Sequence, residues 1–385
     1  MPTFTYDPST AQFQDEIWDV YRTMRDDHPV YRHPDGSFYA LSRFGDVWEA
    51  VHDWQTFSNV VDEATTLLPQ MIFTDPPRHT ELRGLVSRAF TPARVAELEP
   101  FVRQTARSLL DEVAEKGGCE AQHHYAAVVP SLAIARLIGV PAAHIDDFRS
   151  WTGSFIEITG TADYAEAAAH IYGLFARLLA DRRRAPADDL MTALLQAELD
   201  GHRLSDDELL GFCLLLILAG NDTTSSLIGS GLALLATDPD LRHLLLADDS
   251  LWPPAVEELN RMESPAQALS RTATRDVTLH GLTIPAGARV MLLWGSANHD
   301  EREFEDPETF DLTRRSPRHL AFSHGIHFCL GANLARLEAR VALEEWHHRF
   351  PSYELAGEPV RARSIWARTY SSIPLKVETS VNQPG

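Results

Sequence analysis

Cysteine is scarce in this chain, and several other signals are missing. Among 385 residues there are three cysteines, Cys119, Cys213 and Cys329, too few and too scattered for a disulfide framework or a zinc site. The amino terminus has neither a basic start nor an apolar run, and the longest apolar stretch, 209–220, is shorter than the roughly 20 residues that span a bilayer. These absences argue against a disulfide-rich secreted domain and favour a cytoplasmic protein without a membrane anchor.

Positive charge is also in short supply. Lys and Arg number 34 against 55 Asp and Glu, which gives a net charge of −21 and makes nucleic acid an improbable partner. The chain is 44% hydrophobic, without repeats or an obvious linker, so it can bury a large core. We expect one domain over residues 1–385 and a monomer.

The loop around Cys329 is the most informative feature present. Gly325 lies four residues before the thiol and Gly331 two after it, and an apolar helix then runs to Phe350. Free N–H groups at the start of that helix should lower the thiol's pKa. Both glycines can adopt positive φ and let the backbone pass close to a large flat group. The pattern indicates a cradle for a metal-bound thiolate; the alternative is a buried small hydrophobe in a turn.

This loop resembles the haem-binding signature of the cytochrome P450 mono-oxygenases. The similarity is carried by Phe322, Gly325, His327, Cys329 and Gly331. It implies haem b with Cys329 as the axial ligand of the iron. It also implies a mainly α fold with small β-sheets, a triangular helical prism in which haem lies between a long central helix and the helix after the loop. Ser323 departs from the family, which usually has glycine there.

A long buried helix is predicted in the middle of the chain. Ser205 and Glu208 form a capping box, and nothing stops the helix before Asp238, a length on the order of 50 Å. Five consecutive poor helix formers, 220–224, interrupt its apolar run. We expect a bend or an opened hydrogen-bond ladder there; the alternative is a polar flaw on an exposed stripe.

The same stretch resembles the family's oxygen-activation motif. The resemblance implies that Asp222 and Thr223 deliver protons during activation of dioxygen. It also implies that Gly220 leaves room beside the iron and that Ala219 contacts the cofactor.

Further residues match the family's supporting positions. Glu258 and Arg261 share a helix face and should form a buried ion pair, although an exposed pair is the ordinary alternative. The resemblance implies that this pair clasps a residue of the following meander, for which Arg314 is the candidate. It also implies four cationic donors for the two haem propionates, each of which could instead be a solvated surface residue: His79, Arg83, Arg271 and His327.

Short strands are expected as a hairpin over 30–41, around an Asp-Gly turn, and as a strand pair within 277–293. By analogy with the family, the substrate pocket is lined by Leu67, Leu68, Met71, Ile72, Phe155, Leu215, Gln267, Leu269 and Tyr370. These side chains suit a largely apolar small molecule. They do not distinguish a steroid from a terpenoid, fatty acid, polyketide or small aromatic.

Together these residues predict a haem-thiolate mono-oxygenase that inserts one oxygen atom of O2 into such a molecule, most simply by hydroxylation. No Gly-x-Gly-x-x-Gly motif is present, so electrons from NAD(P)H should arrive through a ferredoxin and its reductase. The helices expected to border the thiolate side carry Arg88, Arg336, Arg340 and His347, which would allow a locally basic docking face despite the acidic chain. Alternatives are epoxidation, oxidative coupling or desaturation by the same oxidant, a catalytically inactive scaffold, or a non-catalytic haem-binding sensor or carrier.

Overall fold

The structure is a computed structural model that describes residues 4–61, 70–87, 90–156, 161–198, 201–314, 318–364 and 367–378. The helices are α1 (Ala11–Asp27), α2 (Phe44–His52), α3 (Arg78–Ser87), α4 (Pro92–Ala96), α5 (Glu99–Lys116), α6 (Val128–Ile138), α7 (Ile145–Ile156), α8 (Thr161–Arg184), α9 (Leu190–Gln196), α10 (Asp206–Thr237), α11 (Pro239–Ala247), α12 (Trp252–Glu263), α13 (Trp294–Ala297) and α14 (Ala332–Arg349). The strands are β1 (Val30–Arg32), β2 (Tyr39–Leu41), β3 (Phe57–Ser58), β4 (Gly118–Glu120), β5 (Ala268–Ala273), β6 (Val277–Leu279), β7 (Leu282–Ile284), β8 (Arg289–Leu293), β9 (Tyr353–Leu355), β10 (Val360–Arg361), β11 (Tyr370–Ser372) and β12 (Pro374–Val377).

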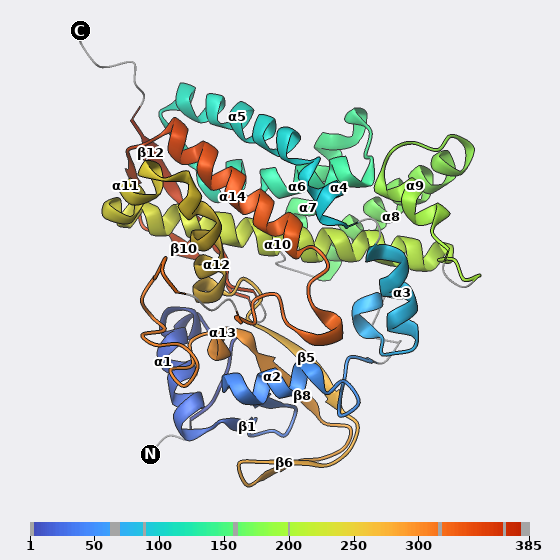
Figure 1. Ribbon diagram of the computed structural model, residues 1–385, viewed down its shortest axis with the longest axis vertical. Coiled ribbons are helices and arrows are strands. Elements are labelled where there is room, and N and C mark those ends of the chain that lie inside the picture. The colour runs from blue at the N-terminus through green and yellow to red at the C-terminus, as the bar shows by residue number, and fades with distance from the viewer. Residues whose placement is uncertain are drawn as a thin grey trace.

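Helix α10 crosses the helical part of the molecule (Figure 1). The predicted capping box is present, because the Ser205 hydroxyl accepts the Glu208 N–H and the Glu208 carboxylate accepts the Ser205 N–H at 2.9 Å. The poor helix formers at 220–224 do not break the helix. Instead the Thr223 hydroxyl donates to the Ala219 carbonyl at 2.7 Å, one turn earlier. Among the described helices, α10 is long and apolar enough to cross a membrane, but 67% of its most apolar window is buried in the fold.

Helix α14 places the Cys329 loop against α10. It packs on α5, α10 and α12, and in Figure 1 it runs in front of α10 with α5 above. Its buried face, which includes Leu334, Leu337 and Val341, belongs to the largest apolar core, as the periodicity predicts. The start of α14 is therefore fixed relative to the middle of α10.

A β-rich part lies at the amino-terminal side of the molecule (Figure 1). Its five-stranded sheet has the order β1-β2-β8-β5-β3. The predicted 30–41 hairpin is confirmed, with Val30 opposite Leu41 and Gly36 at φ +77°. The strand pair predicted within 277–293 is also confirmed as β6 and β7, whereas β8 pairs in parallel with β2 and antiparallel with β5.

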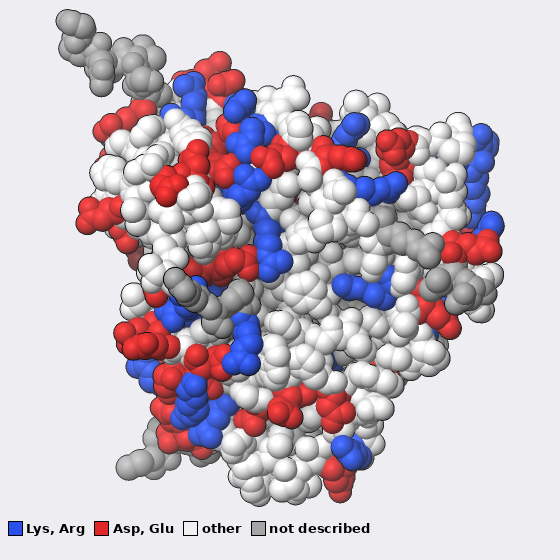
Figure 2. Space-filling view, in the orientation of Figure 1, with Lys and Arg blue, Asp and Glu red and all other residues white. Residues whose placement is uncertain are grey.

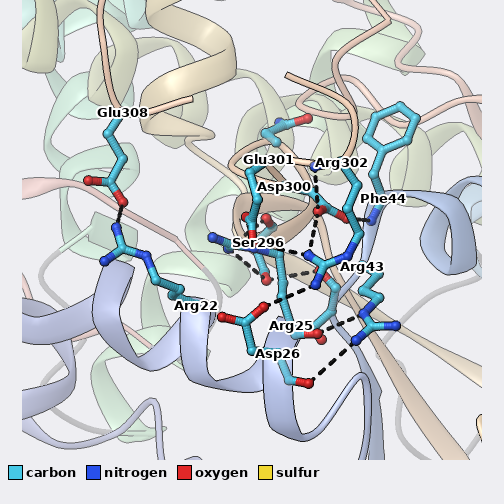
Figure 3. Close-up of polar contacts among 12 residues, drawn as sticks. Arg22, Arg25, Asp26, Arg43, Phe44, Ser296, Asp300, Glu301, Arg302 and Glu308 are labelled. Carbon is cyan, nitrogen blue, oxygen red and sulfur yellow. Dashed lines mark hydrogen bonds and ion pairs between the residues drawn. The ribbon is translucent and has the colours of Figure 1, made fainter. Parts of the chain in front are cut away.

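A polar network joins α1 and α2 to the segment after α13 (Figure 3). Arg25, only 1% exposed, donates to the Ser296 carbonyl at 3.1 Å. Asp300 accepts the Phe44 N–H at 2.8 Å and the Arg302 guanidinium at 3.0 Å. These bonds give the buried charges of Arg25 and Asp300 partners and fix α1, α2 and the 296–302 segment relative to one another.

Candidate active site

A cavity is lined by α10, the start of α14, the loop before it, α3 and β5, and its empty volume of about 1330 Å³ includes space open to solvent. Its wall is mainly apolar with a few polar side chains, which is the usual composition of a small-molecule site. Cys329 lines the cavity, whereas Cys119 and Cys213 do not, and burial raises the pKa of both of those thiols to about 12.

The Cys329 loop is closed by a hydrogen bond from the Cys329 N–H to the Phe322 carbonyl at 2.9 Å. The predicted lowering of the thiol's pKa is wrong for this protein without its metal. Burial raises the pKa of Cys329, and the Gly331 N–H and the charges of Arg83 and Arg336 offset this only in part. Desolvation outweighs the helix end, so the neutral thiol is favoured in the absence of a bound cation.

The two loop glycines have different roles from each other. Gly331 lines the cavity, where a Cβ would meet nothing within 4 Å, and its φ is −85°, not positive. Gly325 does have positive φ, +66°, but its close neighbour is protein: a Cβ there would lie 2.5 Å from the Val51 carbonyl oxygen. Gly331 therefore leaves space in the cavity, and Gly325 lets α2 pack beneath the loop.

The four predicted propionate donors come together at one end of the cavity. His79, Arg83 and His327 line it; Arg271 does not, but it is buried beside them at 5% exposure. Burial first, and then the charges of His79, Arg271 and Arg83, lower the pKa of His327 to about 3, and burial lowers the pKa of Arg271 to about 10. The Nε2 atoms of His79 and His327 have no hydrogen-bond partner among the described residues.

The four donors of this cluster have few carboxylates near them in the described part of the structure. Asp75 is the carboxylate whose charge acts on both His79 and Arg271. Buried donors without acceptors are costly. Two carboxylates of a bound group would accept from these side chains and raise the pKa of both histidines. The residues therefore fit the haem that the loop's resemblance implies.

Asp222, Thr223 and Gly220 lie on α10 at the middle of the cavity. Thr223 and Gly220, with Ala219, line it; Asp222 is not a lining residue, and burial raises the pKa of its carboxyl to about 7. Gly220 is also a packing position, because a Cβ there would lie 2.8 Å from the Ile134 side chain. A carboxyl with this pKa can take up and release a proton near neutral pH.

The structure brings Glu258, Arg261 and Arg314 together. Glu258 and Arg261 are 5% and 1% exposed and form two hydrogen bonds, at 2.8 and 2.9 Å. Arg314 reaches Glu258 at 3.0 Å, and Arg261 donates to the Asn298 carbonyl at 2.7 Å. Every charge in this group has an oppositely charged or hydrogen-bonding partner. A buried ion pair is tolerated in a fold only when its charges are compensated in this way.

The expected basic docking face is not what the structure has. His347 is fully buried, and burial lowers its pKa to about 3 because α14 turns that side chain toward Tyr353. Arg340 pairs with Glu344 and Glu99, and Arg336 pairs with Glu257. Arg88 lies outside the described residues. Figure 2 shows basic side chains interleaved with acidic ones over α5 and α14.

The predicted substrate pocket is placed only in part. Met71, Ile72, Leu215 and Leu269 line the cavity. Leu67, Leu68 and the side chain of Phe155 lie outside the described part of the structure.

Gln267 and Tyr370 do not line the cavity, so their assignment to the pocket is corrected. The side-chain amide of Gln267 donates to the backbone carbonyls of Glu263 and Ser264. The Arg361 guanidinium lies over the ring of Tyr370, 3.7 Å from the centroid of that ring.

Sequence reasoning missed a polar recess of the cavity. Thr224, Asn260 and Glu338, from α10, α12 and α14, all line the cavity, and the Thr224 hydroxyl donates to the Glu338 carboxyl. Burial raises the pKa of Glu338 well above its usual range. Asn260 Nδ2 and Glu338 Oε1 have no partner among the described residues, which suits a bridging water. The signal was available: Glu338 stands on the apolar face of α14, between Leu334 and Val341.

Comparison with known proteins points to one family. The family model for Cytochrome P450 matches residues 154–248 and 251–358. The chain is 39% identical to Vitamin D(3) 25-hydroxylase from Pseudonocardia autotrophica over 97% of its own length and 96% of that protein.

Two solved structures share the fold. Cytochrome P450 CYP109Q5 from Chondromyces apiculatus superposes with a TM-score of 0.91 at 37% identity, covering 98% of this chain and 99% of that one. CYP109E1 from Bacillus megaterium, in complex with testosterone, superposes with a TM-score of 0.88 at 32% identity, covering 94% and 99%.

Proposed function

This chain belongs to the cytochrome P450 family and is a mono-oxygenase with haem b as its cofactor, and we propose that it hydroxylates a neutral, largely apolar small molecule. The observation that carries the proposal is the arrangement of one cavity. Cys329 and a group of basic side chains, His79, Arg83 and His327, line it, and the remaining described wall is mainly apolar, with Thr223, Ser323 and the recess as its polar parts.

We assign Cys329 as the ligand of the iron and His79, Arg83, Arg271 and His327 as the donors to the propionates. When bound, haem supplies the activation of dioxygen, which amino-acid side chains cannot perform. Phe322 and Gly331, which line the cavity near Cys329, would leave space for the group. The basic side chains would fix its orientation through charge-assisted hydrogen bonds.

Asp222 and Thr223 supply the protons that dioxygen cleavage consumes. A carboxyl whose pKa is raised to about 7 holds a proton in a large fraction of molecules near neutral pH, and it can be reprotonated after releasing it. Thr223 lines the cavity, and its hydroxyl donates to the Ala219 carbonyl at 2.7 Å. Rotation of this hydroxyl toward the cavity would extend a proton path from Asp222 into the cavity.

The substrate is proposed to be uncharged and polycyclic. The described side chains on the wall away from the cationic cluster and the recess offer no ionic partner; they include Met71, Ile72, Phe90, Phe212, Leu215 and Leu269. A charged substrate would lose its hydration there without compensation. Two of the relatives support a substrate of this size and polarity. One is named for the hydroxylation of vitamin D(3), and the other was solved in complex with testosterone.

We further propose that electrons come from NAD(P)H through a ferredoxin and its reductase. The acceptor is proposed to be a single-domain monomer located in the cytoplasm. The argument is that this chain carries no flavin or dinucleotide motif of its own.

The test is turnover of a panel of neutral steroids and secosteroids with a surrogate ferredoxin, its reductase and NADPH, followed by mass spectrometry. A product heavier by one oxygen atom, formed in step with NADPH oxidation, supports hydroxylation. Epoxidation also adds one oxygen and is separated from hydroxylation by the product's NMR spectrum. Desaturation or coupling gives other masses. Reversible binding without NADPH-coupled product would support the sensor or carrier alternative.

A further inference from the structure

Arg336 occupies an unusual position on the cysteine side of the cavity. Its guanidinium lies 4.5 Å from the ring centroid of Phe322, a cavity-lining residue whose carbonyl accepts the Cys329 N–H. A cation at this place stabilises negative charge on the sulfur.

Glu257 on α12 holds Arg336 there. Its two oxygens accept from Arg336 Nε at 2.5 Å and Nη2 at 2.9 Å, a bidentate geometry that fixes the plane of the guanidinium. The same carboxylate contacts His319 Nε2 at 3.2 Å, and His319 Nδ1 accepts the Ala321 N–H. Glu257 therefore connects α12, α14 and the cysteine loop.

We propose that Glu257 is a positioning residue that fixes the Arg336 charge over Phe322, and that this charge sets the reduction potential of the thiolate-ligated iron. The step concerned is the one-electron reduction of ferric to ferrous iron, in which dithionite or the ferredoxin supplies the electron. The reduced site carries one more negative charge, so a nearby cation favours it. The proposal rests on the assignment of Cys329 as ligand, which the absorption spectrum of the carbon monoxide complex checks separately in every variant.

The experiment is a potentiometric titration of the haem-loaded protein with dithionite and mediators, without substrate. Arg336→Gln should lower the ratio of reduced to oxidised protein at a fixed potential by on the order of tenfold. Glu257→Gln should shift the ratio in the same direction by less, because the released guanidinium moves into solvent. In the double variant, Glu257→Gln should cause no further decrease of this ratio beyond that of Arg336→Gln, because the carboxylate then has no cation to hold.

Two further variants separate this role from general loosening of the loop. Arg340→Gln removes an arginine one turn further along α14, paired with Glu344 and Glu99, and should leave the potential unchanged. Arg336→Lys keeps the charge but loses the bidentate contact, and should recover part of the shift. An unchanged potential in Arg336→Gln, an equal shift in Arg340→Gln, or a Glu257→Gln effect that persists without Arg336 would overturn the proposal. If Glu257→Gln does not fold, the three arginine variants still decide the role of Arg336.

Discussion

Replacement of Glu338 by glutamine should change how the protein's stability depends on pH. Glu338 is 1% exposed, and burial raises the pKa of its carboxyl well above the usual value of about 4.5 that applies in the unfolded chain. Between those two pKa values the folded protein holds one proton more than the unfolded chain. The free energy of unfolding therefore falls as pH rises, by about 1.4 kcal/mol per pH unit for this one group.

Glutamine preserves the shape of the side chain and cannot ionise, so Glu338→Gln removes that slope. We expect the free energy of unfolding of the variant, relative to the parent, to rise by about 1.4 kcal/mol between about pH 5.5 and about pH 6.5. The assay is guanidinium unfolding of both proteins across this range. Glu354→Gln, at a side chain 69% exposed, is the control and should run parallel to the parent. A constant difference between Glu338→Gln and the parent would show that Glu338 is ionised in the fold and would refute the account of the recess.

Three other outcomes follow from the same structure. Glu258→Ala strands two buried or half-buried arginines and should cost about 3–5 kcal/mol in urea unfolding; Glu308→Ala, from a pair with both side chains 48% exposed, should cost at most about 1 kcal/mol, and equal losses would contradict the structural role. Asp222→Asn should reduce product formed per NADPH oxidised, with turnover down about 10²-fold. The parent's turnover should decline as pH rises through about 7 and that of the variant should not; matching pH profiles would remove Asp222 as proton donor. Gly325→Ala, with positive φ and a Cβ 2.5 Å from a backbone oxygen, should lose about 1–3 kcal/mol of stability, whereas Gly45→Ala, with open space around it, should lose none; the two are compared by thermal unfolding, and a stable Gly325→Ala protein would mean that the loop can move away from α2.

Local signals were sufficient for the elements that frame the site. The capping box at Ser205 and Glu208 marks the start of α10, and the Asp35-Gly36 turn marks the hairpin of β1 and β2. These features depend on residues a few positions apart, so their physics is contained in short segments. The fold was predicted from the resemblance in the 322–331 loop, because the spacing of the matching residues in this loop is typical of one family.

Side-chain directions could not be predicted in the same way. Tyr370 and His347 each turn away from the predicted surface toward a partner on the neighbouring element, Arg361 nine residues before Tyr370 and Tyr353 six residues after His347. Likewise the pKa of the Cys329 thiol is raised by burial, which depends on the whole fold, more than it is lowered by the helix end beside it. Both the side-chain directions and the burial depend on how the elements pack against one another, which a local sequence pattern does not specify.

The most direct test of the central claim is the carbon monoxide difference spectrum of the purified, dithionite-reduced protein beside that of Cys329→Ser. The account predicts the strongly red-shifted Soret band of thiolate-ligated haem in the parent and its loss in the variant. Absence of haem from the parent, an imidazole-like band in freshly prepared protein, or a red-shifted band that survives in Cys329→Ser would contradict the assignment of Cys329 as the iron ligand.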